Sequence, residues 1–183
     1  MYKNLKTYGI FVTEGVKDLM TPKSEDDIKK TLEDKTPEEK IKFGTRNDLN
    51  WLIKLGIDEG VDIQMDDNYI IKWSSEKGYF DLVKLALEKG ADIHAEGDRA
   101  LKNAIFFGFK DMAEYLINKG ADVNTDEGYM LSLPAQKGYY DITKMLLDNG
   151  IKLTRRTKYA IKMAIEKGHQ DIADLIKSYE KSN

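Results

Sequence analysis

Residues 80–93 read FDLVKLALEKGADI, and the pattern returns as KDMAEYLINKGADV at 110–123 and as YDITKMLLDNGIKL at 140–153. A last copy reads QDIADLIKSYEK at 170–181, and a degraded copy precedes the others at 48–63. The interval between the intact copies is thirty residues. Self-similarity at a fixed period of roughly 20–50 residues is typical of proteins built from stacked structural repeats.

Each copy carries an apolar stripe with helical spacing. Leu82, Val83, Ala86 and Leu87 lie on one face of a helix with 3.6 residues per turn. A glycine follows the stripe, as at Gly90, where a left-handed residue ends a helix without a steric penalty. A shorter periodic run lies upstream, before an earlier glycine. We therefore expect each unit to be a helix, a tight turn, a second helix and an extended segment, with the apolar stripe buried by stacking of neighbouring units.

The repeated pattern begins with glycine and an aromatic residue, continues with D-apolar-apolar-K and ends with G-A-D-apolar. Over roughly residues 36–180, this pattern resembles the ankyrin repeat. The resemblance implies an all-α ankyrin-repeat solenoid of about five helix-turn-helix units, the first degenerate and the last a cap, with short hairpin fingers. The predicted units are about 36–65, 66–95, 96–125, 126–155 and 156–183. Two features are similar to ankyrin proteins of large DNA viruses and phages: the family's T-P-L-H start is absent, and the period is thirty rather than about 33 residues.

Residues 1–35 do not follow the repeat, and we expect them to form a helical extension. Ser24, followed by acidic residues, predicts the start of a helix of about nine residues. The sequence Thr36-Pro37-Glu38-Glu39 predicts a capping box with proline at the first helical position. We expect the apolar stripe of residues 5–12 to pack on the exposed end of the array and cap it. A secretory signal would need an apolar core of about 7–15 residues, which is absent.

A second interpretation of the N-terminus rests on resemblance. Lys6-Thr7-Tyr8, Phe11-Val12 and Glu14 look like the leader of internal capsid proteins of tailed phages. That resemblance implies targeting into the prohead and proteolytic cleavage between Glu14 and Gly15.

Composition and motifs argue against several classes of function. The net charge of −3 gives no overall attraction to nucleic acid or to a membrane surface, and no apolar run approaches the roughly 18 residues of a membrane span. The sequence contains no cysteine, and its two histidines, His94 and His169, are far apart. His169 replaces the ring found at Tyr79, Phe109 and Tyr139, which indicates a structural role. We therefore expect no metal, no cofactor and no enzyme activity.

Two features favour a binding surface. Phe106 and Phe107 replace residue pairs that other units keep polar, such as Glu76-Lys77, and exposed aromatic residues often anchor protein interfaces. Trp73 occupies another register that we expect to face outward. A basic stretch without acids spans 152–162, whereas 58–67 carries five acids and no base. The candidate partner-binding residues are Trp73, Phe106, Phe107, Lys152, Arg155, Arg156, Lys158 and Lys162. The alternatives are aromatic packing between helices and a solvated basic loop.

Together these patterns predict a monomeric, non-catalytic interaction module that binds a protein partner on the concave face. With the viral resemblance, the prediction is a phage or viral ankyrin protein that sequesters a host protein, such as a defence factor, in the host cytoplasm. The leader would carry it in the virion. The alternative is a structural virion component held in the capsid through that leader.

Overall fold

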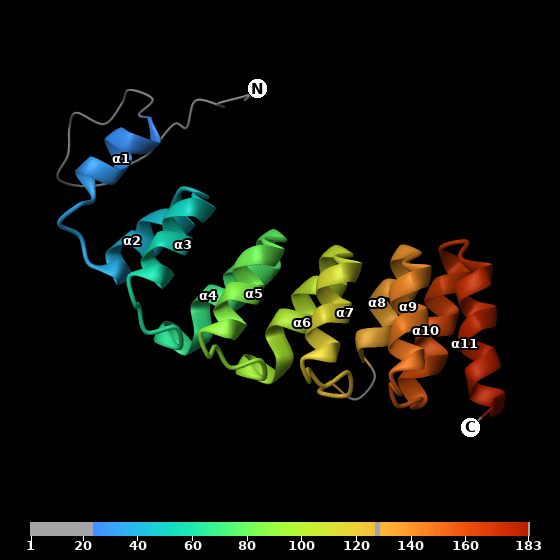
Figure 1. The fold of residues 1–183 in the computed structure, drawn as a ribbon. Coiled ribbons are helices and arrows are strands. Elements are labelled where there is room, and N and C mark those ends of the chain that lie inside the picture. The colour runs from blue at the N-terminus through green and yellow to red at the C-terminus, as the bar shows by residue number, and fades with distance from the viewer. Residues whose placement is uncertain (1–23, 127–128, 183) are drawn as a thin grey trace. The chain divides into compact units, whose positions relative to one another are not determined.

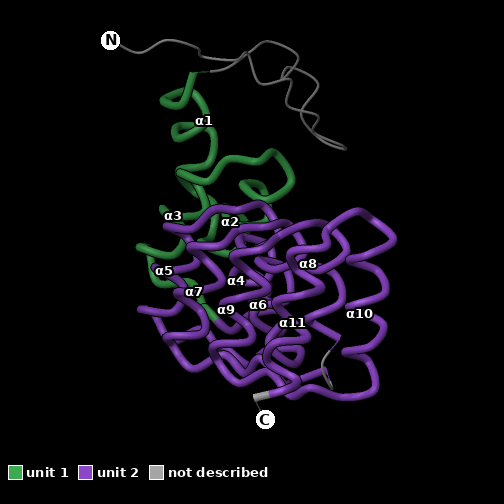
Figure 2. Tube along the Cα trace, turned by 90° about the vertical axis from the view of Figure 1, so that its right-hand side faces the viewer, with its two compact units in different colours: residues 1–63 green, residues 64–183 purple. Residues whose placement is uncertain are grey.

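The computed structural model describes residues 24–126 and 129–182, and every regular element within them is a helix (Figure 1). The elements are α1 (Glu25–Thr31), α2 (Pro37–Arg46), α3 (Asn50–Asp58), α4 (Met65–Lys77), α5 (Phe80–Glu88), α6 (Ala95–Phe107), α7 (Lys110–Asn118), the 3-10 turn η1 (Tyr129–Leu131), α8 (Ser132–Lys137), α9 (Tyr140–Asp148), α10 (Arg155–Glu166) and α11 (Gln170–Ser182). They fall into two compact units, residues 1–63 and 64–183 (Figure 2). The helix pairs confirm the predicted helix-turn-helix solenoid.

In the first unit, both predicted helix starts are present. Ser24 and Asp27 form a capping box at the start of α1, and Thr36 and Glu39 form another at the start of α2, with Pro37 as its first residue. α1 has seven residues rather than about nine. Ile28 and Leu32 of α1 are buried in one cluster with two leucines of the α2–α3 region, Leu49 and Leu52. This short helix therefore packs on the α2–α3 region.

The contact between α2 and α3 depends on a glycine. A Cβ added at Gly56 would lie 2.8 Å from Cγ1 of Ile41 and 2.9 Å from the carbonyl oxygen of Pro37. Later units carry a larger residue at this position, so the first pair of helices approaches more closely here than a side chain would allow. An ion pair also joins the two helices of this region, because Nζ of the buried Lys40 lies 2.7 Å from a carboxylate oxygen of Glu59.

The second unit has two layers of helices. The first helices of successive pairs, α4, α6, α8 and α10, contact one another in order, and each second helix packs on its own partner (Figures 1 and 2). The predicted stripe accounts for the core between the layers: Leu82, Val83 and Ala86 are buried in α5, as are Met112, Ala113 and Leu116 in α7.

Glycines end the first helices as predicted. Gly78, Gly108 and Gly138 all have a φ between 77° and 79°. The backbone N–H of the next residue then turns back to the helix, as from Phe109 to the carbonyl oxygen of Ala104 at 2.8 Å. This closure leaves only two residues between paired helices, the glycine and the aromatic residue after it, which is why the turns are tight.

The fingers after each second helix carry a feature that the repeat pattern does not indicate. Instead of an extended hairpin, residues 66–68 and 96–98 each form a turn of three consecutive left-handed residues. The last residue of each turn bonds to the next finger. Oδ1 of Asn68 accepts from the backbone N–H of Asp92 at 2.7 Å, and Oδ1 of Asp98 accepts from Asp122 at 2.9 Å. Neighbouring fingers are thus tied together by buried side chains.

The helix that contains Pro134 is shortened. The first helix of this pair begins with the 3-10 turn Tyr129–Leu131 and becomes α-helical only from Ser132. Pro134 therefore lies in the first turn of α8, where a missing backbone N–H removes no intrahelical hydrogen bond.

Candidate functional site

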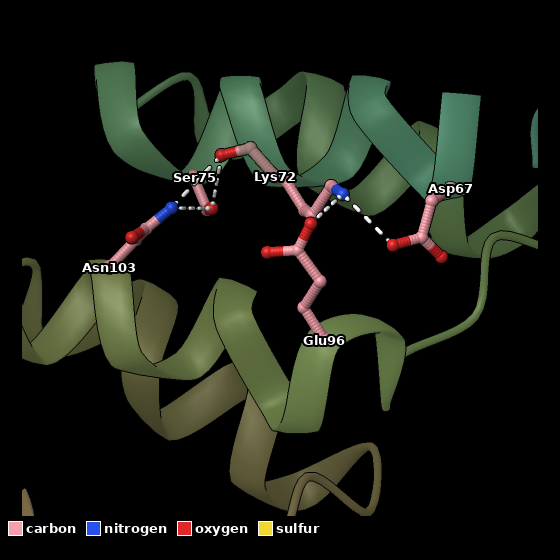
Figure 3. Close-up of polar contacts among 5 residues, drawn as sticks. All are labelled: Asp67, Lys72, Ser75, Glu96 and Asn103. Atoms are coloured by element: carbon pink, nitrogen blue, oxygen red, sulfur yellow. Dashed lines mark hydrogen bonds and ion pairs between the residues drawn. The ribbon is translucent and has the colours of Figure 1, made fainter. Parts of the chain in front are cut away.

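The base of the candidate site is a polar bridge between α4 and α6. Nδ2 of the buried Asn103 donates to the carbonyl oxygen of Lys72 and to Oγ of Ser75, both at 3.1 Å (Figure 3). Ser75 in turn donates to the same carbonyl at 2.7 Å. These bonds hold the two first helices in a defined register and use both donors of the amide.

Next to this bridge, an ion pair links the same two helices. Nζ of Lys72 lies 2.5 Å from Oε1 of Glu96 and 3.3 Å from Oδ2 of Asp67 (Figure 3). Partial burial lowers the pKa of Lys72, but the bonds to Glu96 and Asp67 outweigh it and raise the pKa above its ordinary value. Lys72 is thus a charged structural link, and its charge is neutralised within the array.

Two exposed aromatic rings stand at the carboxyl end of α6. Phe106 is 47% exposed and Phe107 is 41% exposed, as the sequence predicts. Their ring centroids are 4.8 Å apart in an edge-to-face arrangement, and Phe107 stacks on Phe109 at 5.9 Å. The rings therefore support each other while one side of Phe106 stays open.

The open side of Phe106 faces a groove of about 500 Å³. The groove lies over α6 and the η1–α8 segment, and its lining residues are Glu76, Arg99, Lys102, Asn103, Ile105, Phe106, Phe107, Asp126, Tyr129, Met130 and Leu133. We call this set the first-helix groove. It combines apolar and aromatic surface with a few charged groups, which is typical of ligand and peptide sites.

Cations gather at the finger end of this groove. Arg99 is the first residue of α6 after the left-handed turn, and it is exposed. The guanidinium carbon of Arg156 lies 5.8 Å from the ring centroid of Tyr129, a groove residue that is itself 55% exposed. Lys102 is paired with Asp126 at 3.7 Å. No described acidic side chain pairs with Arg99 or Arg156.

The remaining basic candidates are not among the residues that line the groove. Lys152, Arg155, Lys158 and Lys162 are all exposed, and Lys162 pairs with Glu166 at 3.5 Å. Trp73 differs from the others. It is only 9% exposed and packs against Tyr79 with ring centroids 5.4 Å apart, so the expectation that it faces outward is corrected. The acidic stretch 58–67 falls on both sides of the division between the two units.

Residues 41–127 match the family model for ankyrin repeats, in three copies. This part of the chain is therefore similar to ankyrin repeats. The match begins in α2 and ends just before η1, and the α8–α9 and α10–α11 pairs continue the same arrangement of helices. No curated protein matches the chain. Ankyrin repeats are generally protein-protein interaction modules, and the match indicates this class of function.

Both histidines lie close to other residues of the array, His169 to Gly138 and His94 to Asp98. A Cβ at Gly138 would lie 2.6 Å from Cε1 of His169, so this ring occupies the space above the glycine. Nδ1 of His94 lies 3.0 Å from Oδ1 of Asp98. Residues 24–126 and 129–182 contain no group of three metal-ligating side chains, and no helix among them is long and apolar enough to cross a bilayer.

Tyr129 and Arg99 were not predicted as site residues from the sequence. Their shared position in the thirty-residue repeat could have indicated them. Both share a repeat position with Tyr69 and Tyr159, and the side chains of Arg99, Tyr129 and Tyr159 are exposed. The predicted cleavage site, Glu14 and Gly15, lies outside the described residues.

Proposed function

We propose that this ankyrin protein captures a protein partner in the first-helix groove, with Phe106 and Phe107 as anchors. The observation that carries the proposal is the exposure of these two rings at positions where other units have Glu76-Lys77, Gln136-Lys137 and Glu166-Lys167. Exposing two phenylalanines forgoes roughly 1.5–3 kcal/mol of burial free energy for each. Clustered exposed rings beside a groove are typical of binding sites.

A pull-down from host lysate tests this proposal. The bait is the full chain, compared with the double variant Phe106→Gln, Phe107→Lys, which restores the pair found at 136–137. The matched control is Tyr140→Gln, since Tyr140 is an exposed ring on a second helix. We expect a protein that binds the parent and the control but not the double variant, with unchanged helicity in all three. A partner retained by the double variant would contradict the proposal.

We further propose that the protein is of the phage or viral type, that it sequesters a host protein in the host cytoplasm, and that its N-terminal leader carries it in the virion. The support is the thirty-residue period and the likeness of residues 6–14 to capsid-targeting leaders. Recovery from purified virions of a chain that begins at Gly15 would support the leader, and a Glu14→Gln variant should then remain uncut. A chain found only in lysate, starting at Met1, would contradict it.

The second candidate function is a structural virion component. The same leader favours it, because a leader directs a protein to the capsid whatever the protein does there. Quantifying free and capsid-bound protein during infection separates the two functions. A scaffold should stay in the capsid, whereas a sequestering protein should be found with its host partner.

A further inference from the structure

We infer that the first-helix groove takes an extended acidic segment of its protein partner, with an apolar side chain beside Phe106 and a carboxylate at Arg99 and Arg156. The inference rests on the proposed function and specifies its ligand. It follows from a separation along the groove. Apolar surface lies at Phe106, and positive charge without a described acidic partner lies at Arg99 and Arg156.

The apolar end of the groove is built around Phe106. Nζ of Lys137 donates to the carbonyl oxygen of Phe106 at 2.9 Å and lies 4.4 Å from the centroid of its ring. Phe107 meets the same ring edge to face. Phe106 is therefore held from two sides and is accessible from the groove, where Met130 and Leu133 add apolar surface. A rigid ring in such a setting binds an apolar side chain with little loss of its own conformational entropy.

The opposite end has positive charge that no described acidic side chain neutralises. Arg99 and Arg156 have no acidic partner among the described residues, in contrast to Lys72 and Lys102, which are paired with Glu96 and Asp126. The first turns of α4 and α6 contain acids, but α10 begins with Arg155 and Arg156 and has no acid in its first turn. Cations at the amino end of a helix are unfavourable, and a bound carboxylate would offset this cost.

The charges also set the direction of the segment. Glu76 lines the groove and occupies the repeat position of Phe106, so it places a negative charge near the apolar end. A carboxylate of the partner is repelled there and attracted to the finger end. The segment therefore lies with its acidic residue toward Arg99 and its apolar residue toward Phe106.

The length of α6 gives the spacing. Phe106 lies seven positions after Arg99 in the same helix, which corresponds to about 10 Å along the helix axis. An extended chain advances about 3.3 Å per residue, so about three residues cover this distance. The inferred motif is an acidic residue, two residues of any type, and an aromatic or aliphatic residue.

A displayed library of random peptides, selected on the full chain and counter-selected on the Phe106→Gln, Phe107→Lys variant, tests the inference. We expect enriched peptides to carry Asp or Glu separated by two residues from Phe, Trp, Leu or Ile. A synthetic peptide of the consensus, measured by fluorescence anisotropy, should lose about tenfold or more in affinity to the Arg99→Gln, Arg156→Gln variant, and less at high salt. The matched charge control is Lys89→Gln, Lys119→Gln, which removes two exposed cations outside the groove and should bind as the parent does.

The other outcomes are distinguishable. Peptides that need Phe106 but not the two arginines, or that lack an acid, would overturn the inference and leave the proposed function intact. Failure to select any peptide that depends on the two phenylalanines would overturn both. A thymidine oligonucleotide that binds through the same arginines and displaces the peptide would assign the groove to single-stranded nucleic acid and overturn the inference.

Discussion

The ring of Phe109 lies so close to Gly78 that a Cβ at position 78 would come within 2.7 Å of its Cζ. The same relation joins Tyr139 to Gly108 at 2.9 Å and His169 to Gly138 at 2.6 Å. Each glycine that ends a first helix therefore also makes room for the ring of the next unit. This contact between units explains why glycine and an aromatic residue recur together at the thirty-residue interval.

This relation predicts that two left-handed glycines will respond differently to the same substitution. Gly78 and Gly90 both have positive φ, but only Gly78 faces a ring, and a Cβ at Gly90 meets nothing within 4 Å. Both alanine variants should lose about 1–2 kcal/mol from backbone strain, and Gly78→Ala should lose more because the ring of Phe109 must shift. Urea unfolding followed by circular dichroism measures the difference. Equal losses at the two positions would show that the ring contact is unimportant.

The polar bridge between α4 and α6 should be essential for their register. Asn103→Ala removes both hydrogen bonds from α6 to Lys72 and Ser75 of α4, so we expect a loss of about 1–3 kcal/mol in the free energy of unfolding. Asn118→Ala is the control, since Asn118 is exposed at the end of α7. Urea midpoints at matched slopes give the comparison, and an Asn103→Ala midpoint equal to that of the control would contradict this role.

Alanine usually stabilises a helix relative to glycine, but we expect the reverse at Gly56. The new Cβ would meet Ile41 and the carbonyl oxygen of Pro37, and overpacking of this kind costs about 1–3 kcal/mol. Lys54→Ala, an exposed position on the same helix, should change stability by less than about 0.5 kcal/mol. Thermal and urea unfolding of the two variants test this. A stabilised Gly56→Ala protein would show that α2 and α3 have room to separate.

The carboxyl end of the array should show a pH-dependent link between α9 and α11. Hydrogen bonds from Lys144 and from the hydroxyl of Tyr179 lower the pKa of Asp148 below its ordinary value of 3.8. The same bond to Asp148 raises the pKa of Tyr179 above 10.0. The stabilisation is therefore complete between these ordinary values, is lost in acid as the pH falls through the lowered pKa of Asp148, and is lost in base as Tyr179 ionises.

Tyr179→Phe tests this link. We expect it to be less stable than the parent near neutral pH, with a difference that shrinks in acid as Asp148 becomes protonated. Tyr159→Phe, with an exposed ring on α10, is the control and should follow the parent at every pH. A stability difference for Tyr179→Phe that does not change with pH would mean that Asp148 has no part in it.

Much of the fold was predictable because helix periodicity and glycine spacing are local signals. Leu82, Val83 and Ala86 are buried where the stripe places them, and Pro134 shortens its helix as its ring geometry requires. The helix caps at Ser24 and Thr36 could also be predicted, since such a cap involves residues only three positions apart. The left-handed finger turns were not, because bonds such as that from Asp92 to Asn68 join residues of different units.

The site was only partly predictable for the same reason. The exposure of Phe106 and Phe107 followed from their departure from the repeat, whereas Trp73, which was expected to face outward, is buried against Tyr79. Whether such a ring is exposed depends on the size of its neighbours. The contact between Arg156 and Tyr129 could not be read from either residue, because it joins helices of successive units.

The sequence by itself determined the repeat, its period, the helix pairs and the identity of the array, because these follow from residue types at fixed local spacings. The tertiary structure alone decided which rings lie against glycines and which side chains tie the fingers together. It also decided where aromatic surface lies next to arginines that have no acidic partner among the described residues. The physical reason is that these features depend on distances between atoms of stacked units, and such distances are set by packing across the array.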